Sequence, residues 1–159
     1  MKVTIIAVGK LKEQYLTDAC REYIKRLTGF CRTEIIEIGE ERLPENPSPA
    51  EIAAALAAEG ERLAARIPKG AYVTALCVEG AAEASELFAA GIKKAALSGF
   101  SEFAFIIGGS WGLSDNIKAA AHKRLSLSKM TFPHQLTRVI LLEQLYRAFS
   151  INNHGKYHK

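Results

Sequence analysis

Cysteine is scarce in this sequence, with three cysteines among 159 residues. Cys20, Cys31 and Cys77 are scattered, odd in number and form no CxxC pair. This pattern supports neither a disulfide framework nor a cysteine-based zinc site. We therefore expect small buried thiols in a reducing compartment, and we expect no metal.

Long apolar runs are also missing. The longest ones fall far short of the roughly 20 residues that cross a bilayer. The first run, Val3 to Val8, ends at Gly9-Lys10 and is more typical of a buried strand than of a signal peptide. We expect a cytoplasmic protein with no membrane partner.

Two nucleotide-binding signatures are absent. The segment Val8-Gly9-Lys10-Leu11 lacks the glycine spacing of a dinucleotide fingerprint, and no Gly-Lys-Ser/Thr follows a glycine-rich run. These absences argue against an α/β enzyme that uses NAD or ATP, which stays an alternative. A glycine-rich run is present at Ile107–Leu113, but a tight turn into a helix would explain it equally well.

Acidic residues are nearly absent from the C-terminal part of the chain, although the net charge of the whole chain is only +4. From Asn116 onwards Glu143 is the one acid, against eight basic residues: Lys118, Lys123, Arg124, Lys129, Arg138, Arg147, Lys156 and Lys159. This end of the chain is either a face for a polyanion or a solvated basic surface.

Alternating strand and helix patterns fill the rest of the sequence. We expect strands at 2–8, 33–38, 71–78, 103–107 and 125–128, and helices at 11–27, 48–67, 83–97, 114–122 and 134–149. Ser48, Pro49 and Glu51 form a capping box at one helix start. The alternation predicts one α/β domain over residues 1–159, with a parallel sheet covered on both faces.

Ligands of such sheets bind beyond the carboxyl ends of the strands. Three segments are expected there: Leu76–Gly80, Ile107–Leu113 and Leu127–His134. The last mixes apolar residues with hydroxyls, which suits either a wall around an adenine ring or a plain strand end. The helix at 134–149 is apolar on more than one side, which favours core packing or a subunit interface. The tail at 152–159 is either frayed or faces RNA.

The motifs are most specific in the C-terminal third: Leu125-Ser126-Leu127-Ser128-Lys129-Met130-Thr131-Phe132-Pro133-His134-Gln135, then Arg138, Glu143-Gln144-Leu145-Tyr146-Arg147-Ala148 and Tyr157-His158-Lys159. The start, Met1-Lys2 to Leu11-Lys12, and Phe105–Ser110 with Gly112-Leu113 fit the same pattern. Together they resemble the ribosomal large subunit pseudouridine N3-methyltransferases, the RlmH family, over essentially the whole chain.

The resemblance implies a SPOUT-type α/β fold, with a parallel sheet flanked by helices and a C-terminal trefoil knot. It implies S-adenosyl-L-methionine as cofactor, and a homodimer that shares its active site. The substrate would be N3 of a pseudouridine in large-subunit (23S) ribosomal RNA of assembled ribosomes. Matched by motif, the cofactor contacts would be Leu76, Gly108, Leu127, Ser128, Lys129, Met130, Thr131 and Phe132.

Methylation of N3 also requires the N3 proton to leave. We expect Arg147, Tyr157 and His158 to be catalytic, with His158 nearest the proton and the others binding RNA or the base ring. His134 is a weaker candidate, because it could simply cap its helix. Cys77 stands where family members usually carry an acidic residue, and we do not expect it to act as a nucleophile. The alternative function is a non-catalytic RNA-binding protein with a vestigial pocket.

Overall fold

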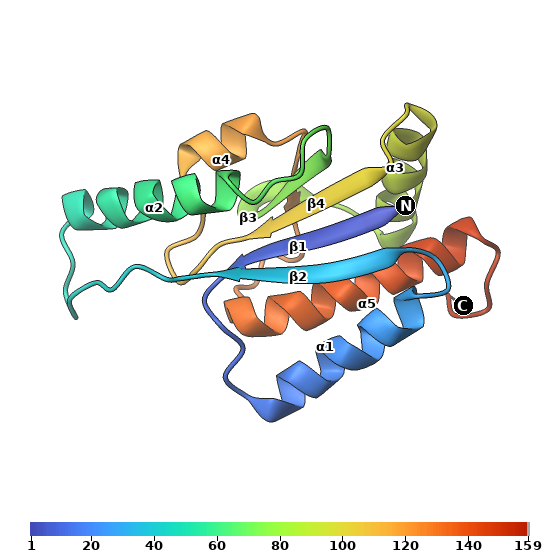
Figure 1. The fold of residues 1–159 in the computed structure, drawn as a ribbon, viewed down its shortest axis with the longest axis horizontal. Helices are drawn as coiled ribbons and strands as arrows, with labels where there is room; N and C mark the ends of the chain where they lie inside the picture. Colours follow the sequence, from blue (N-terminus) through green and yellow to red (C-terminus); the bar gives the residue numbers. More distant parts are fainter. Residues whose placement is uncertain (159) are drawn as a thin grey trace.

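The computed structural model describes residues 1–158 as one five-stranded sheet with flanking helices (Figure 1). All neighbouring strands are parallel, in the order β2-β1-β4-β3-β5. Their bounds are β1 Lys2–Val8, β2 Arg32–Ile38, β3 Tyr72–Ala82, β4 Glu102–Ile107 and β5 Lys123–Ser126. The parallel α/β arrangement predicted from the sequence is confirmed. Lys159 lies outside the described residues.

The helices cover both faces of the sheet, as Figure 1 shows, with α2 and α4 on one side and α1 and α5 on the other. Their bounds are α1 Gln14–Leu27, α2 Pro49–Ala64, α3 Ser85–Leu97, α4 Asp115–Ala120 and α5 His134–Asn152. Alternate residues of β1 explain this layering. Val3 and Ile5 join the core beneath α1, α3 and α5, whereas Ile6 and Val8 join the core beneath α2 and α4. No helix within residues 1–158 is both long and apolar enough to span a membrane.

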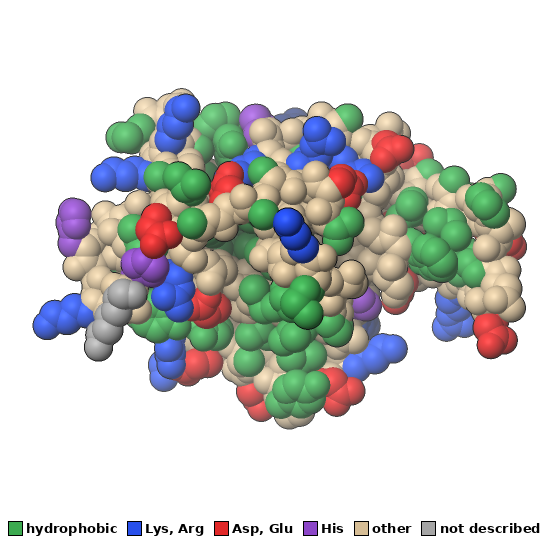
Figure 2. Space-filling view, turned by 180° about the vertical axis from the view of Figure 1, so that it is seen from behind, with side chains coloured by type: hydrophobic (Ala, Val, Ile, Leu, Met, Phe, Trp, Pro, Cys, Tyr) green, Lys and Arg blue, Asp and Glu red, His purple; other side chains and the backbone are tan. Residues whose placement is uncertain are grey.

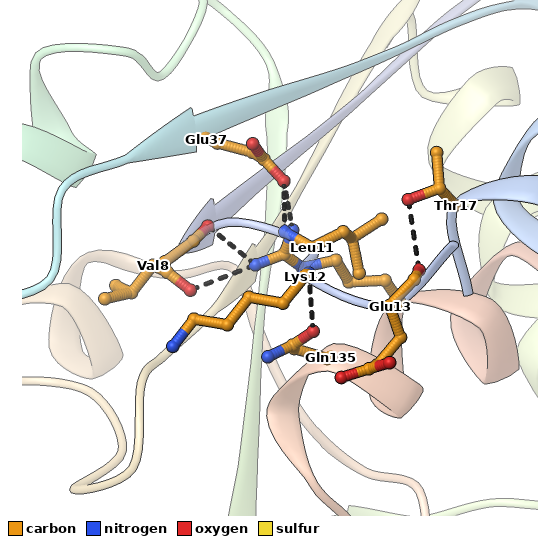
Figure 3. Close-up of polar contacts among 9 residues, drawn as sticks. Val8, Leu11, Lys12, Glu13, Thr17, Glu37 and Gln135 are labelled. Atoms are coloured by element: carbon orange, nitrogen blue, oxygen red, sulfur yellow. Dashed lines mark hydrogen bonds and ion pairs between the residues drawn. The ribbon is translucent and has the colours of Figure 1, made fainter. Parts of the chain in front are cut away.

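Helix α1 begins three residues later than predicted. Leu11 and Lys12 stay outside the helix because their backbone N–H groups donate to the side chains of Glu37 and Gln135, at 3.0 Å each (Figure 3). Tyr15 lies within the predicted helix but is 69% exposed. The buried residues of α1 are Leu16, Cys20 and Leu27.

Strands β3 and β5 differ from prediction because of a bulge. Leu125 pairs with both Leu76 and Ala81, so residues 77–80 are looped out and β3 extends to Ala82. A side chain on Gly80 would collide with the backbone of β5, 2.6 Å from the Leu125 carbonyl carbon. Strand β5 ends at Ser126 rather than at residue 128. There the Ser126 hydroxyl donates to the Ser128 carbonyl at 2.9 Å and turns the chain away.

One fully buried charge fixes the start of α5 against the sheet. The Arg138 guanidinium donates to Glu37 Oε1 at 2.5 Å and to the carbonyls of Val8 and Gly9 at 3.1 and 2.8 Å. Figure 3 shows Glu37, Val8 and Leu11 converging at this point. The two terminal nitrogens of Arg138 are satisfied in this way, whereas its buried Nε has no partner among the described residues. A buried guanidinium needs such a partner for its charge, and Glu37 supplies it. The contact therefore holds the beginning of α5 at the carboxyl ends of β1 and β2.

Candidate active site

A cavity of about 800 Å³ lies beyond the carboxyl ends of β3, β4 and β5. This is the edge where parallel sheets bind ligands, and the volume suits a nucleoside-sized molecule. Its walls include residues of all three segments expected from the sequence: residues 76–79, 107–113, and 127–128 with 130–134, together with Leu125 and Ser126 of β5. Thr137 and Lys118 complete the lining.

Glycines set the shape of the wall that follows β4. A β-carbon on Gly108 would overlap the carbonyl group of Gly112. Gly112 itself has φ +84°, which side chains other than glycine rarely adopt, and its N–H donates to the Gly109 carbonyl at 3.1 Å. The run is therefore a closed turn whose bare backbone faces the cavity, as the binding interpretation requires.

The opposite wall is the loop between β5 and α5. Its curvature is held by the side chain of Ser128, which accepts the backbone N–H of Met130 at 2.9 Å. The Met130 side chain is 73% exposed at the rim. The loop thus offers mainly apolar surface and backbone groups to a ligand.

Seven of the eight predicted cofactor positions line this cavity: Leu76, Gly108, Leu127, Ser128, Met130, Thr131 and Phe132. Lys129 is exposed and does not contribute to the lining. The sequence pattern therefore located the three wall segments, which are far apart along the chain and meet only in the folded sheet.

The β3 bulge forms the third wall and carries Cys77. Burial raises the pKa of the Cys77 thiol, and the nearby Glu79 carboxylate adds to the effect. A protonated thiol is a poor nucleophile. Glu79 is paired with Lys118 of α4 at 2.7 Å, so an ion pair closes one side of the cavity.

The predicted catalytic residues gather elsewhere, near the C-terminal end of α5. Arg147 donates to Glu143 Oε1 at 2.5 and 3.0 Å, and its guanidinium lies 4.8 Å from the centre of the Tyr157 ring. His158 Nδ1 lies 3.4 Å from the Arg147 guanidinium, and His158 Nε2 lies 2.9 Å from Glu86 Oε1. We call these five residues the tail cluster.

Glu143 holds the tail cluster together. Its Oε1 also accepts the Tyr157 hydroxyl at 3.2 Å. Burial raises the pKa of Tyr157 to about 12, and contacts with Tyr23 and Glu143 add to the shift. Sequence reasoning missed Glu143 and Glu86 as partners, although Glu143 was visible as the one acid in a basic segment.

The tail cluster and the cavity do not meet within one chain. None of the tail-cluster residues lines the cavity. Arg147 lies 13 residues beyond His134 on the same helix, which corresponds to about 20 Å along its axis. The candidate catalytic residues are thus brought together with one another, but not with the cofactor positions of their own chain.

His134, the weaker candidate, does line the cavity. The capping interpretation of this residue was wrong, because the N-cap is Pro133 and no side chain caps the helix. Burial lowers the pKa of His134, Glu40 raises it, and Arg138 and Lys12 lower it further. Within residues 1–158, no group of histidine, cysteine or acidic side chains is arranged to hold a metal ion.

Known proteins resemble this chain over its whole length. A family model described as a predicted SPOUT methyltransferase matches residues 1–158. The chain is 50% identical over 159 residues to the ribosomal RNA large subunit methyltransferase H of Streptococcus thermophilus, with 100% of both chains covered. It is 51% identical over 154 residues to ribosomal RNA large subunit methyltransferase H 1 of Thermoanaerobacter pseudethanolicus, with 97% of this chain and 99% of that protein covered.

The fold is also similar to a solved structure, that of a probable methylase family protein from Haemophilus influenzae Rd KW20. The TM-score is 0.54 at 13% identity, and the match covers 99% of this chain and 70% of the other. At that identity the likeness supports the fold alone. The family model and the full-length relatives carry the assignment: the chain belongs to the SPOUT methyltransferases and, within them, to the ribosomal RNA large subunit methyltransferase H family.

Proposed function

We propose that this protein methylates N3 of a pseudouridine in large-subunit (23S) ribosomal RNA, on assembled ribosomes in the cytoplasm, with S-adenosyl-L-methionine as the methyl donor. The observation that supports this most directly is the glycine-walled cavity. Its three walls are the segments that carry the family motifs, and seven motif positions line it.

The cavity fits this donor. Gly108 and the turn that follows it leave backbone groups bare, as a close approach to a flat adenine ring requires. Leu76, Leu127 and Phe132 supply apolar contact, and Thr131 a hydroxyl group. When bound, S-adenosyl-L-methionine supplies a methyl group already activated by a positive sulfur atom. We also propose the C-terminal trefoil knot of the family for this chain, around the loop between β5 and α5.

Alignment is the main task of the protein in this reaction. The walls of the cavity hold the donor, and a second group has to hold the target base in line with it. Correct placement of two reactants contributes roughly 7–11 kcal/mol to lowering a barrier of this kind. Arg147 and Tyr157 have the chemistry to hold a base, since they offer a fixed positive charge and an aromatic ring.

We propose that these residues act on the cavity of a second copy of the chain, in a homodimer. The tail cluster lies too far from the cavity of its own chain to act there. Figure 2 shows apolar side chains gathered on the lower middle of the face seen from behind, between charged side chains. Tyr15 at the start of α1 and Leu136 at the start of α5 are among the exposed large apolar residues. An apolar surface on these helices fits a subunit interface.

The test is incubation of the purified protein with methyl-labelled S-adenosyl-L-methionine and ribosomes that lack the modification. The labelled nucleoside is then identified by mass spectrometry. We expect label in 3-methylpseudouridine of the large-subunit RNA. Label in another nucleoside would overturn the proposed target, and cofactor binding without any transfer would favour the non-catalytic RNA-binding alternative.

A further inference from the structure

Three polar side chains meet at the mouth of the cavity, away from the tail cluster. Glu40 follows β2, Ser110 follows β4, and His134 is the first residue of α5. The Ser110 hydroxyl donates to Glu40 Oε1 at 3.4 Å. Ser110 and His134 also line the cavity, whereas Glu40 lines a neighbouring pocket that shares Ser110 with it. The His134 ring therefore faces the space in which the reaction would occur, with Glu40 behind it.

Gly9 lies beside this cluster at the carboxyl end of β1. His134 Nε2 and Glu40 Oε2 lie 3.5 and 3.6 Å from the position that a β-carbon of Gly9 would occupy. Gly9 has φ +81°, so the chain turns here in a conformation that favours glycine. The imidazole and the carboxylate therefore face a common point above the end of the sheet.

The surroundings of His134 favour the neutral imidazole at neutral pH. Burial is the main cause of its lowered pKa. Arg138 on its own helix and Lys12 in the loop after β1 act in the same direction, while Glu40 opposes them. The ring also stands at the N-terminus of a helix of 19 residues, whose dipole disfavours a positive charge. A neutral imidazole beside a carboxylate is able to accept a proton.

His158 is placed differently. Its Nε2 lies 2.9 Å from Glu86 Oε1, and its Nδ1 lies 3.4 Å from the Arg147 guanidinium. Because both ring nitrogens are already in contact with side chains of the tail cluster, neither is free to accept a proton from the base, and a structural or RNA-binding role suits His158 better. The proton therefore has a better acceptor at the mouth of the cavity than in the tail cluster.

We propose that His134 is a catalytic residue that accepts the N3 proton of the target base, and that Glu40 is a positioning residue for its imidazole. This inference rests on the proposed function. The N3–H bond breaks, the proton moves to His134 Nδ1, because Nε2 is the ring nitrogen on the side of Glu40, and N3 keeps the electron pair. That pair forms the new bond to the methyl carbon while the carbon–sulfur bond of the donor breaks and its electron pair stays on sulfur. Solvent removes the proton from the imidazole afterwards.

The test is the pH dependence of single-turnover methyl transfer to unmodified ribosomes. For His134→Asn we expect a loss on the order of 10²–10⁴-fold at neutral pH, as for removal of a general base. The rate of this variant should then rise with pH across the range in which the wild-type rate is constant, because the imide has to ionise unaided. For Glu40→Gln we expect the acid limb of the profile to move to lower pH, because the carboxylate raises the pKa of His134.

Three controls separate the possible outcomes. Glu41→Gln removes the neighbouring carboxylate, which pairs with Arg62 and does not line the cavity, and should leave the pH profile unchanged.

Two further controls show whether His134→Asn still folds: the donor affinity, measured by calorimetry, and the midpoint of thermal denaturation. If this variant does not fold, His134→Gln replaces it. A wild-type pH profile in both His134 variants, or a profile changed by His158→Asn instead, would overturn the inference. Absence of 3-methylpseudouridine with the wild-type protein would overturn the proposed function itself.

Discussion

The cavity and the tail cluster differ in what holds them. The cavity is shaped by the backbone: Gly80 and Gly108 lie where a side chain would collide with main-chain atoms. The tail cluster is held by side chains, through the contacts of Glu143 and Glu86 with Arg147, Tyr157 and His158. Backbone packing is insensitive to salt, whereas partly exposed ion pairs are weak and screened. The cavity is therefore suited to be a preformed binding site, whereas the tail cluster is suited to exchange its contacts when RNA or a second chain binds.

The largest expected effect comes from deletion of Tyr157 to Lys159, which removes the tail and leaves the cavity intact. We expect methyl transfer to fall by about 10³-fold, similar to the loss of a group that stabilises developing charge. Donor affinity, measured by calorimetry, should stay unchanged because the tail does not line the cavity. Normal turnover by the truncated protein would remove the tail from the catalytic machinery.

The complementary change is Gly108→Ala, which damages the cavity and leaves the tail intact. The new β-carbon would displace the turn at Gly112. Such overpacking costs about 1–3 kcal/mol. If this cost falls on the donor site, donor affinity should decrease by about 10-fold to 100-fold. Gly29→Ala is the matched control, because nothing lies within 4 Å of its β-carbon position. Unchanged affinity in Gly108→Ala would show that the donor does not bind at this turn.

A smaller effect, on stability, is expected for Arg138→Met. The substitution leaves Glu37 and the carbonyls of Val8 and Gly9 without their donor. The Glu37 side chain that remains is 31% exposed and keeps the Leu11 N–H, so we expect a cost of about 2 kcal/mol in the free energy of unfolding, below that of breaking a fully buried pair. Arg26→Met removes an exposed ion pair with Glu22, which is screened by solvent, and should change the free energy of unfolding much less. Equal results in chemical denaturation would contradict the anchoring role of Arg138.

The smallest effect concerns the titration of Tyr157. Its pKa in the folded protein is about 12, against about 10 for a free tyrosine. The neutral phenol of Tyr157 therefore stabilises the folded tail cluster fully below about pH 10, and this stabilisation is lost as the pH rises towards 12 and the hydroxyl ionises. The difference in phenolate absorbance between the wild type and Tyr157→Phe should show a midpoint near pH 12. A midpoint near 10 would mean that Tyr157 does not pack in the tail cluster in solution.

The cavity could be predicted from the sequence more fully than the tail cluster. Parallel strands end at one edge of a sheet, so the segments after β3, β4 and β5 had to come together, and their motifs identified them. Arg147, Tyr157 and His158 were named by motif, and their catalytic role stays a prediction. Their pairing with Glu143 and Glu86 could not be predicted, because ion pairs between α5, α3 and the tail depend on side-chain geometry that has no period along the chain.

Local hydrogen bonds explain the remaining errors. The start of α1 moved because Leu11 and Lys12 donate to side chains of β2 and α5. Helical periodicity records which face is buried, and it carries no information about such distant partners. The bulge of β3 was missed for a similar reason, since Gly80 is required by the backbone of β5 and not by its own neighbours.

The central claim is that the cavity of one chain works with the tail of another, and mixed dimers test it directly. Gly108→Ala and the protein lacking Tyr157 to Lys159 are co-expressed with different affinity tags, and dimers that carry both tags are isolated. Each such dimer holds one intact cavity and one intact tail on opposite chains, so we expect about half of the wild-type transfer rate per dimer. The rates are compared at a donor concentration below the dissociation constant of the wild type, where the Gly108→Ala parent is slow. Isolated mixed dimers that are as slow as either parent would contradict the account, because the cavity and the tail would then have to come from the same chain.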